Sequence, residues 1–186
     1  AILGGSAGAT GSGTLFTLNL AGTVTGTGTV TVNSVIARDL DNAPVAGIPG
    51  PPASITIDNT VPDAVVLAAV QKKSGNDGDG TTKIDLSWSG TVTPGDSVLI
   101  YRAGWGNYPE YDDVGGGVPA IPTAYPPAAP WVFAATLTTP VVAYDDEVAW
   151  PQRDFWYYVA FVEDTCGNVS VVSNRTGGTL GYHLGD

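Results

Sequence analysis

Apolar and polar residues alternate along the segments of this chain that could form a core. Near the start, Phe16, Leu18 and Leu20 alternate with polar residues, and Val30 and Val32 alternate with threonines. A two-residue period rich in β-branched side chains is typical of half-buried strands. No segment shows the apolar period and caps that a helix requires. The sequence therefore predicts an all-β protein.

Four short strands are expected in the first part of the chain. Two of them, around residues 16–20 and 29–32, flank the turn-rich residues 22–28 and are predicted to pair as an antiparallel hairpin. A turn is expected at residues 39–42, where short polar side chains follow Arg38. The other two strands are expected at residues 35–38 and 54–58.

A module boundary is expected at residues 59–63, because Pro62 forces the preceding residue into an extended conformation and the apolar pattern restarts after it. We therefore assign residues 1–58 to a first module and residues 59–176 to a second. Residues 177–186 have few core-forming side chains and are predicted to be a linker. Strands of the second module are expected at residues 65–70, 84–88, 97–101, 131–137, 155–162 and 169–172.

One of these strands carries apolar side chains on both of its faces. Phe155, Tyr157, Val159 and Phe161 fall on one face, and the residues between them, which begin with Trp156, are also apolar. Both faces of such a strand must be covered. Residues 155–162 are therefore predicted to form a central strand.

The charge of the chain restricts its partners. Eighteen acidic and seven basic residues give a net charge of −11, which disfavours nucleic acid and anionic lipid surfaces. No apolar run approaches the length that spans a bilayer, so membrane insertion is not expected. Low charge, abundant Thr and Gly and scarce Lys favour a secreted bacterial β-protein, located outside the cell or on its surface.

No residue pattern points to catalysis or to a cofactor. The single His183 lies in the expected linker, and no Ser and Asp are arranged around it as in a triad. The carboxylates at Glu110 and at residues 145–147 are interpreted as an exposed loop and a solvated turn. The single Cys166 can form neither an intrachain disulfide nor a paired zinc site. We expect the protein not to be an enzyme.

Two weaker patterns were weighed in the same way. Asp77 and Asp79 alternate with glycines and resemble part of a calcium loop, but position twelve is Trp88 where such loops have Glu, so a hairpin turn is favoured and no metal site is predicted. Asn168 and Asn174 begin glycosylation sequons, which we interpret as chance occurrences.

Residues 103–130 form a long insertion rich in aromatic, Gly and Pro residues. Long loops inside compact domains are usually functional or flexible. The aromatic side chains suit three roles: a lid over the sandwich, an anchor in a protein interface, or a stacking platform for sugar rings. The aromatic residues concerned are Trp105, Tyr108, Tyr111, Tyr125 and Trp131.

The second module resembles a fibronectin type III domain. The resemblance covers about residues 62–176 and depends on two motifs, Ile-Asp-Leu-Ser-Trp at residues 84–88 and the aromatic strand with its Gly-Asn-Val-Ser turn at residues 155–170. It implies an immunoglobulin-like β-sandwich. The insertion at residues 103–130 departs from the family pattern.

The first module resembles the C-terminal half of a cohesin-like domain. The matching segments are Gly-Thr-Leu-Phe-Thr-Leu at residues 13–18, the Thr- and Gly-rich stretch to Val32, and Arg-Asp-Leu-Asp-Asn-Ala-Pro at residues 38–44. Residues 182–186 are similar to the lead-in to a dockerin module in multimodular secreted bacterial proteins, without the dockerin calcium loops. The resemblance implies that the first module, with about four strands, is an incomplete sandwich.

An incomplete sandwich leaves an apolar face bare and its edges unpaired, which favours association. We therefore expect a non-catalytic structural protein that self-assembles, as a filament subunit completed by a neighbouring copy or another extracellular β-protein. The alternative is an accessory or carbohydrate-binding module of a secreted polysaccharide-degrading or adhesive protein. The expected assembly residues are Ile2, Leu3, Leu15, Phe16, Leu18 and Leu20, with the insertion as a second contact.

Overall fold

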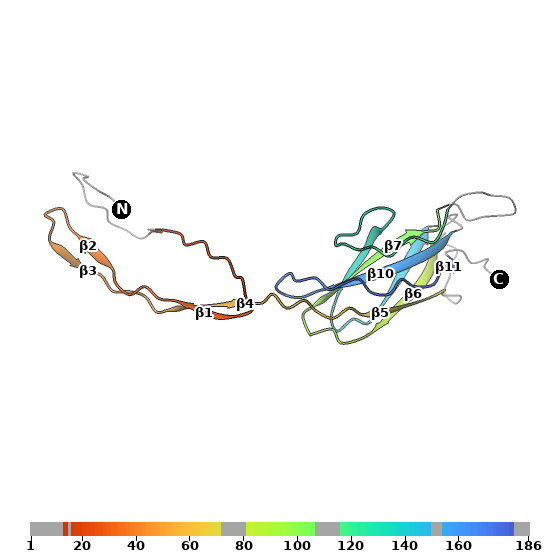
Figure 1. Ribbon diagram of the computed structural model, residues 1–186, viewed down its shortest axis with the longest axis horizontal. Coiled ribbons are helices and arrows are strands. Elements are labelled where there is room, and N and C mark those ends of the chain that lie inside the picture. The colour runs from red at the N-terminus through yellow and green to blue at the C-terminus, as the bar shows by residue number, and fades with distance from the viewer. Residues whose placement is uncertain (1–12, 15, 72–80, 107–115, 150–153, 181–186) are drawn as a thin grey trace. The chain divides into compact units, whose positions relative to one another are not determined.

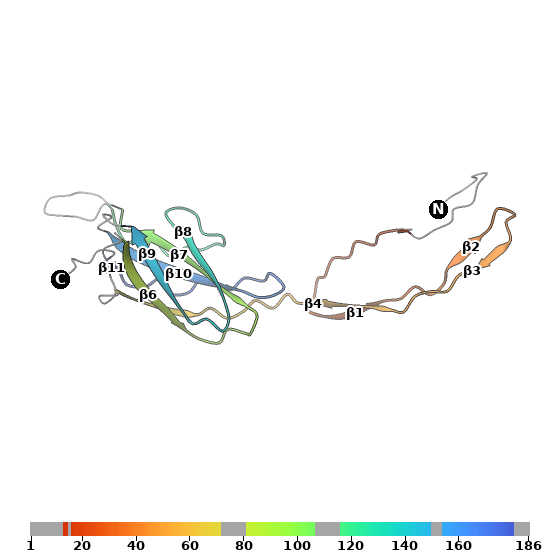
Figure 2. The same ribbon diagram turned by 180° about the vertical axis from the view of Figure 1, so that it is seen from behind.

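The computed structural model describes residues 13–14, 16–71, 81–106, 116–149 and 154–180. In these residues the chain forms strands, turns and loops and no helix, so the protein is all-β (Figures 1 and 2). The chain divides into two compact units after Asn59. We call residues 1–59 unit 1 and residues 60–186 unit 2.

Unit 1 is built around one long antiparallel hairpin. Its base pairs β1 (Gly26–Val30) with β4 (Ala53–Ile57), and its tip pairs β2 (Ile36–Arg38) with β3 (Pro44–Ala46). The expected hairpin between residues 16–20 and 29–32 is wrong. β1 instead pairs with the strand that returns from the tip, and residues 16–20 form no strand.

The turn at the tip explains why the hairpin closes there. The Asp39 carboxylate accepts hydrogen bonds from the backbone N–H groups of Asp41 and Ala43, and Asn42 adopts a positive φ of 62°. The Arg38 guanidinium donates to the carbonyl of Asn42 at 2.7 Å. Asn and Asp tolerate such a turn because their side chains bond to nearby backbone. The Gly- and Thr-rich residues 22–28 provide no comparable set of side-chain acceptors.

Unit 1 has no core among its described residues. None of the side chains at residues 13–14 and 16–59 is buried, although several are large and apolar. An isolated two-stranded hairpin is at best marginally stable in water. The hairpin therefore lacks, within its described residues, the packing that stabilises a sheet.

The described residues of unit 2 form two antiparallel sheets. The three-stranded sheet has the order β5-β6-β9, from β5 (Val66–Gln71), β6 (Thr81–Ser89) and β9 (Ala143–Ala149). The four-stranded sheet has the order β11-β10-β7-β8. Its strands are β7 (Ser97–Gly104), β8 (Val132–Thr138), β10 (Phe155–Glu163) and β11 (Thr179–Leu180). β11 lies within residues 177–186, which were expected to be a linker, and it pairs with β10.

Side chains from both sheets form one core between them. This core includes Leu67, Ile84 and Leu86 from the three-stranded sheet and Ile100 and Tyr158 from the four-stranded sheet. A second cluster lies on the other face of the four-stranded sheet. Its buried members are Leu99, Tyr101, Ala103, Trp131, Tyr157, Val159 and Phe161.

The predicted central strand is confirmed. β10 lies between β11 and β7, and its alternate residues belong to different clusters. Tyr158, Ala160 and Val162 face the core between the sheets, whereas Tyr157 and Val159 face the second cluster. The double-sided apolar pattern thus gave the correct position of this strand.

Two expectations for unit 2 are wrong. Residues 145–147, interpreted as a solvated turn, lie inside β9, which pairs with β6. Residues 169–172, expected to form a strand, contribute only an isolated bridge between Glu163 and Val169. Residues 169–172 form no strand because the segment 169–176 bonds to β10 through side-chain oxygens as well as backbone groups.

Every third residue of the segment after the Gly167 turn bonds twice to β10. Each accepts a hydrogen bond from a β10 backbone N–H through its side-chain oxygen and donates its own N–H to the carbonyl of the same residue. Three residues of this segment therefore match two of β10, which a regular ladder does not allow. The pairs are Ser170 with Val162, Ser173 with Ala160, and Thr176 with Tyr158.

This arrangement predicts the effect of removing one hydroxyl. Ser173→Ala leaves the buried N–H of Ala160 without its acceptor, so we expect a loss of about 1–3 kcal/mol in the free energy of unfolding of unit 2. Urea unfolding followed by tryptophan fluorescence measures it. The exposed control Val171→Ser should change the free energy by less than about 0.5 kcal/mol. Equal effects of the two substitutions would contradict the hydrogen-bonding role.

Candidate functional site

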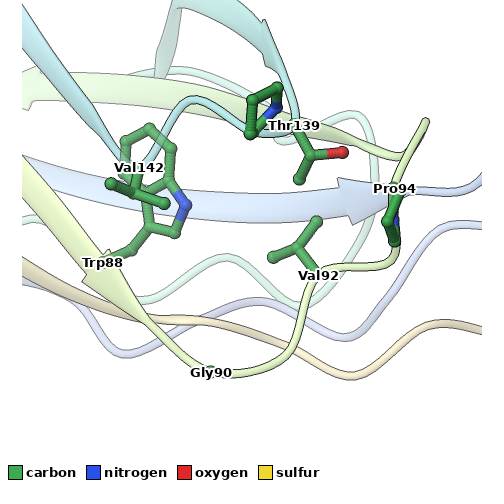
Figure 3. Close-up of a pocket in the computed structure, with 7 residues that line it drawn as sticks. Trp88, Gly90, Val92, Pro94, Thr139 and Val142 are labelled. Carbon is green, nitrogen blue, oxygen red and sulfur yellow. The ribbon is translucent and has the colours of Figure 1, made fainter.

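An apolar cleft of about 500 Å³ opens at one end of unit 2 (Figure 3). It lies between the loop that joins β6 to β7 and the loop that joins β8 to β9. The Trp88 ring faces Val142 on one side of the cleft, and Val92 lies across from Thr139. The lining residues are Trp88, Gly90, Val92, Pro94, Thr139, Pro140 and Val142.

Among the described residues that line the cleft, none carries a carboxylate, amine, imidazole or thiol. The Thr139 hydroxyl already donates to the carbonyl of Thr93 at 3.0 Å and accepts from the N–H of Gly95 at 2.9 Å. The Trp88 indole N–H is buried and has no acceptor. Such a surface suits apolar packing.

A buried polar network joins the two sheets of unit 2. The Arg102 Nη1 donates to both carboxylate oxygens of Asp146, at 2.7 and 2.9 Å, and the Tyr158 hydroxyl donates to Asp146 Oδ2 at 2.9 Å. Asp146 belongs to β9 and is only 2% exposed, whereas Arg102 and Tyr158 belong to β7 and β10 of the other sheet. The Arg102 guanidinium also lies over the Trp156 ring, 5.4 Å from its centre.

The electrostatics of this network stabilise a fixed set of protonation states. Burial, together with the charge of Asp146 and the hydrogen bond to it, raises the pKa of Tyr158 far above its usual value. Burial lowers the pKa of Arg102, but the hydrogen bond and charge of Asp146 outweigh it and the net pKa is raised. Tyr158 thus remains neutral and Arg102 remains charged. The network is a structural joint between the two sheets.

The described aromatic residues of the insertion lie against the four-stranded sheet. Trp131 is 6% exposed within the second cluster, and its Nε1–H donates to the carbonyl of Ala120 at 2.9 Å. Trp105 packs against the same cluster. Tyr125 is 41% exposed and makes edge contacts with Tyr101 and Phe161. In this arrangement Trp131 and Trp105 cover the sheet, and Tyr125 remains accessible.

Arg175 links the insertion to β10. Its Nη1 donates to the carbonyl of Pro119 at 2.6 Å, and its guanidinium lies 5.7 Å from the centre of the Tyr157 ring. A cation over an aromatic face is a favourable contact. Arg175 therefore connects the two, through a hydrogen bond to the insertion and a ring contact with Tyr157 of β10.

Both sequon asparagines are used inside the fold. The Asn168 amide donates to Asp164 Oδ2 at 2.8 Å, and this bond is the main cause of the lowered pKa of Asp164. The Asn174 side chain accepts from the N–H of Leu67 at 2.8 Å and donates to its carbonyl at 3.0 Å. These contacts give both asparagines a structural role.

Several predicted site residues lie outside the described residues, and nothing structural follows for them. Within the described ranges, no group of His, Cys, Asp and Glu side chains could hold a metal ion. No helix of the described chain is long and apolar enough to cross a membrane. The residues outside the description are Ile2, Leu3, Asp77, Asp79, Tyr108, Glu110, Tyr111 and His183, and also Leu15.

The remaining expected assembly residues are all exposed. Phe16 is 72% exposed, Leu18 is 57% exposed and Leu20 is 56% exposed. They lie on a segment of unit 1 with no assigned strand partner. Apolar side chains this exposed and this regularly spaced form a candidate interaction surface.

Comparison of the chain with protein-family models, curated proteins and solved structures found no match. The resemblances to fibronectin type III and cohesin-like domains therefore remain predictions from sequence motifs.

The Asp146 network between the sheets was not predicted from the sequence, although the residue pattern around Asp146 indicates it. Tyr144, Asp146 and Val148 follow the two-residue period of an inward-facing strand, with Asp145 and Glu147 between them. A carboxylate in the middle of such a pattern indicates a buried charge, which requires a partner. The three consecutive acidic residues hid this pattern and favoured the interpretation as a turn.

The network predicts a clear difference between two neighbouring aspartates. Asp146→Ala leaves Arg102 and Tyr158 without their acceptor, so we expect the free energy of unfolding to fall by about 2–4 kcal/mol. The loss is smaller than for a fully buried ion pair because the Arg102 side chain is partly exposed. Asp145→Ala, at an exposed position of the same strand, should change the free energy of unfolding in urea by less than about 1 kcal/mol.

A triple variant separates the charge from the packing. Arg102→Met with Asp146→Leu and Tyr158→Phe replaces the network by apolar groups, and we expect it to recover stability to within about 1 kcal/mol of the unchanged protein. A triple variant that is as unstable as Asp146→Ala would show that the polar network itself is required for the fold.

Proposed function

We propose that this protein is a non-catalytic extracellular structural protein whose copies assemble through unit 1. In this proposal a neighbouring copy completes the first β module, and repetition of the contact builds an oligomer or filament. Unit 2, proposed to be a fibronectin type III-like sandwich, is the folded spacer. One observation carries the proposal: no side chain among residues 13–14 and 16–59 is buried.

The exposed apolar side chains of unit 1 provide the driving force. Full burial of a large apolar side chain stabilises by about 1.5–3 kcal/mol, so covering even a few would exceed the stability that the hairpin has alone. The exposed unit 1 side chains are Phe16, Leu18, Leu20, Val24, Val32, Val35, Ile36, Leu40, Val45 and Ile48.

The distribution of charge also favours contacts through unit 1. Residues 1–59 contain one basic residue, Arg38, and three acidic residues, Asp39, Asp41 and Asp58, which gives −2 of the total of −11. The other −9 belongs to residues 60–186. Like charges repel, so copies of unit 2 disfavour one another, whereas unit 1 is nearly neutral. Association of copies is therefore least opposed at unit 1.

Sedimentation velocity across a concentration series, with electron microscopy of the same samples, tests the proposal. We expect the unchanged protein to form oligomers or filaments as its concentration rises. Phe16→Ser with Leu18→Ser and Leu20→Ser should weaken association by at least about tenfold, because it removes the apolar side chains. All five tryptophans lie in unit 2, so their fluorescence reports whether that unit remains folded.

The control removes the same kind of side chain from exposed positions in unit 2, through Val118→Ser, Ile121→Ser and Val171→Ser. This control should associate as the unchanged protein does. An unchanged protein that remains monomeric at about 100 µM, or equal effects of the two triple variants, would contradict assembly through unit 1.

The alternative function is an accessory or carbohydrate-binding module, and one observation supports it. Tyr125 and Phe133 are both about half exposed, and both contact the ring of Tyr101 at the outer face of the four-stranded sheet. Aromatic faces next to polar groups suit sugar rings. Buried Trp131 is not available for such stacking in this structure.

Retention on polysaccharide affinity gels tests this alternative. Sugar binding predicts retention that falls by about tenfold or more in Tyr125→Ala and in Phe133→Ala, because each removes one ring of the platform. Val171→Ser serves as the control and should be retained normally. Absence of retention on every gel, or retention that neither substitution changes, would contradict a sugar site at these rings.

A further inference from the structure

The base of the unit 1 hairpin has two chemically different faces. Residues directly opposite each other in an antiparallel pair lie on the same face, and successive residues alternate between faces. The observed register therefore makes one face apolar and gives the other face hydroxyl groups. We call the first the apolar ribbon face, and its members are Gly26, Gly28, Val30, Ala53, Ile55 and Ile57. The opposite face carries Thr27, Thr29, Ser54 and Thr56.

Two glycines make the apolar ribbon face uneven. Gly26 lies opposite Ile57, and Gly28 lies opposite Ile55. A Cβ built on either glycine meets no atom within 4 Å, so the space above each glycine is empty. Gly22 of the same chain lies against the Ile57 side chain, so the open part of the face is the space above Gly26 and Gly28, where apolar side chains from a second layer can fit.

Residues 16–20 have the properties of that second layer. Phe16, Leu18 and Leu20 alternate with Thr17 and Asn19, so an extended conformation would present three apolar side chains on one side. All three are more than half exposed. The segment has no strand partner among the described residues.

The two surfaces also match in charge. Neither residues 16–20 nor the two strands of the ribbon contain a charged residue. An apolar contact between them would leave no ionised group buried, which avoids the largest penalty in forming an interface. A charged partner would gain nothing from this face.

We propose that residues 16–20 of a second copy pack across the apolar ribbon face, with apolar side chains inserted above Gly26 and Gly28. The inference rests on the proposed assembly through unit 1 and names the two surfaces that meet. Because the donor segment and the acceptor face are different surfaces, the contact is of the head-to-tail kind. Two copies that exchange segments close into a dimer, and copies that do not exchange extend into a filament.

Filling one hollow tests the contact. Gly28→Val adds a side chain where the folded chain has free space, so the monomer accommodates it, but the new side chain occupies the site of the incoming residue. We expect Gly28→Val to weaken self-association by at least about tenfold in sedimentation experiments. Thr29→Val, which adds a similar apolar group to the hydroxylated face, should change association less than about threefold.

The outcomes separate this inference from the proposal on which it rests. An apolar face that merely aggregates would associate more strongly in Gly28→Val, and that result, or no change, would overturn the arrangement while assembly itself remains. A protein that does not self-associate at all would overturn both.

Disulfide trapping tests which copy donates the segment. One sample carries Leu18→Cys and the other carries Gly28→Cys, both with Cys166→Ser to remove the native thiol. We expect the mixed samples to yield a disulfide-linked dimer in much higher yield than either sample alone. A third sample carries Leu18→Cys and Gly28→Cys in the same chain, again with Cys166→Ser. If this sample forms only an intrachain disulfide and the mixture forms no linked dimer, the segment folds onto its own ribbon and the second copy is excluded.

Discussion

An apolar β surface is stable only when something covers it, and the two units of this protein meet that requirement differently. In unit 2 the two sheets cover each other, and the insertion covers the outer face of the four-stranded sheet with Trp131 and Trp105. In the described part of unit 1, the apolar face of the hairpin is approached by Gly22 at Ile57, but none of its side chains is buried. The difference between a complete and an incompletely covered β module is the basis of the functional proposal.

Unit 2 shows how the chain stabilises positions where regular pairing ends. β10 completes its hydrogen bonds through side-chain oxygens of Ser170, Ser173 and Thr176, so a segment with a three-residue spacing can follow a strand. The two sheets are joined by the Asp146 carboxylate, which has partners on β7 and β10. Both devices satisfy polar groups inside the fold, and the Asp146 network also favours one relative position of the two sheets.

Period-two patterns in the sequence were sufficient for the fold class, for most strands of unit 2 and for the central position of β10. Pairing partners were harder to predict. The turn at residues 39–42 was predicted correctly from its short polar side chains, but the hairpin expected across residues 22–28 was wrong, because β1 pairs with β4, which follows the Asp39 turn. β9 was missed because its inward-facing Asp146 is polar, and its burial depends on Arg102, which is distant in sequence. Contacts of this kind depend on tertiary structure, which local pattern does not contain.

Hydrogen exchange of the β1 and β4 amides, measured as a function of protein concentration, tests the central claim most directly. If a neighbouring copy covers the apolar ribbon face, protection of Val30, Ile55 and Ile57 should rise steeply between about 1 µM and about 1 mM, because association stabilises the folded hairpin by mass action. Protection of β10 should stay constant over the same range. Equal and concentration-independent protection of both regions would contradict the account.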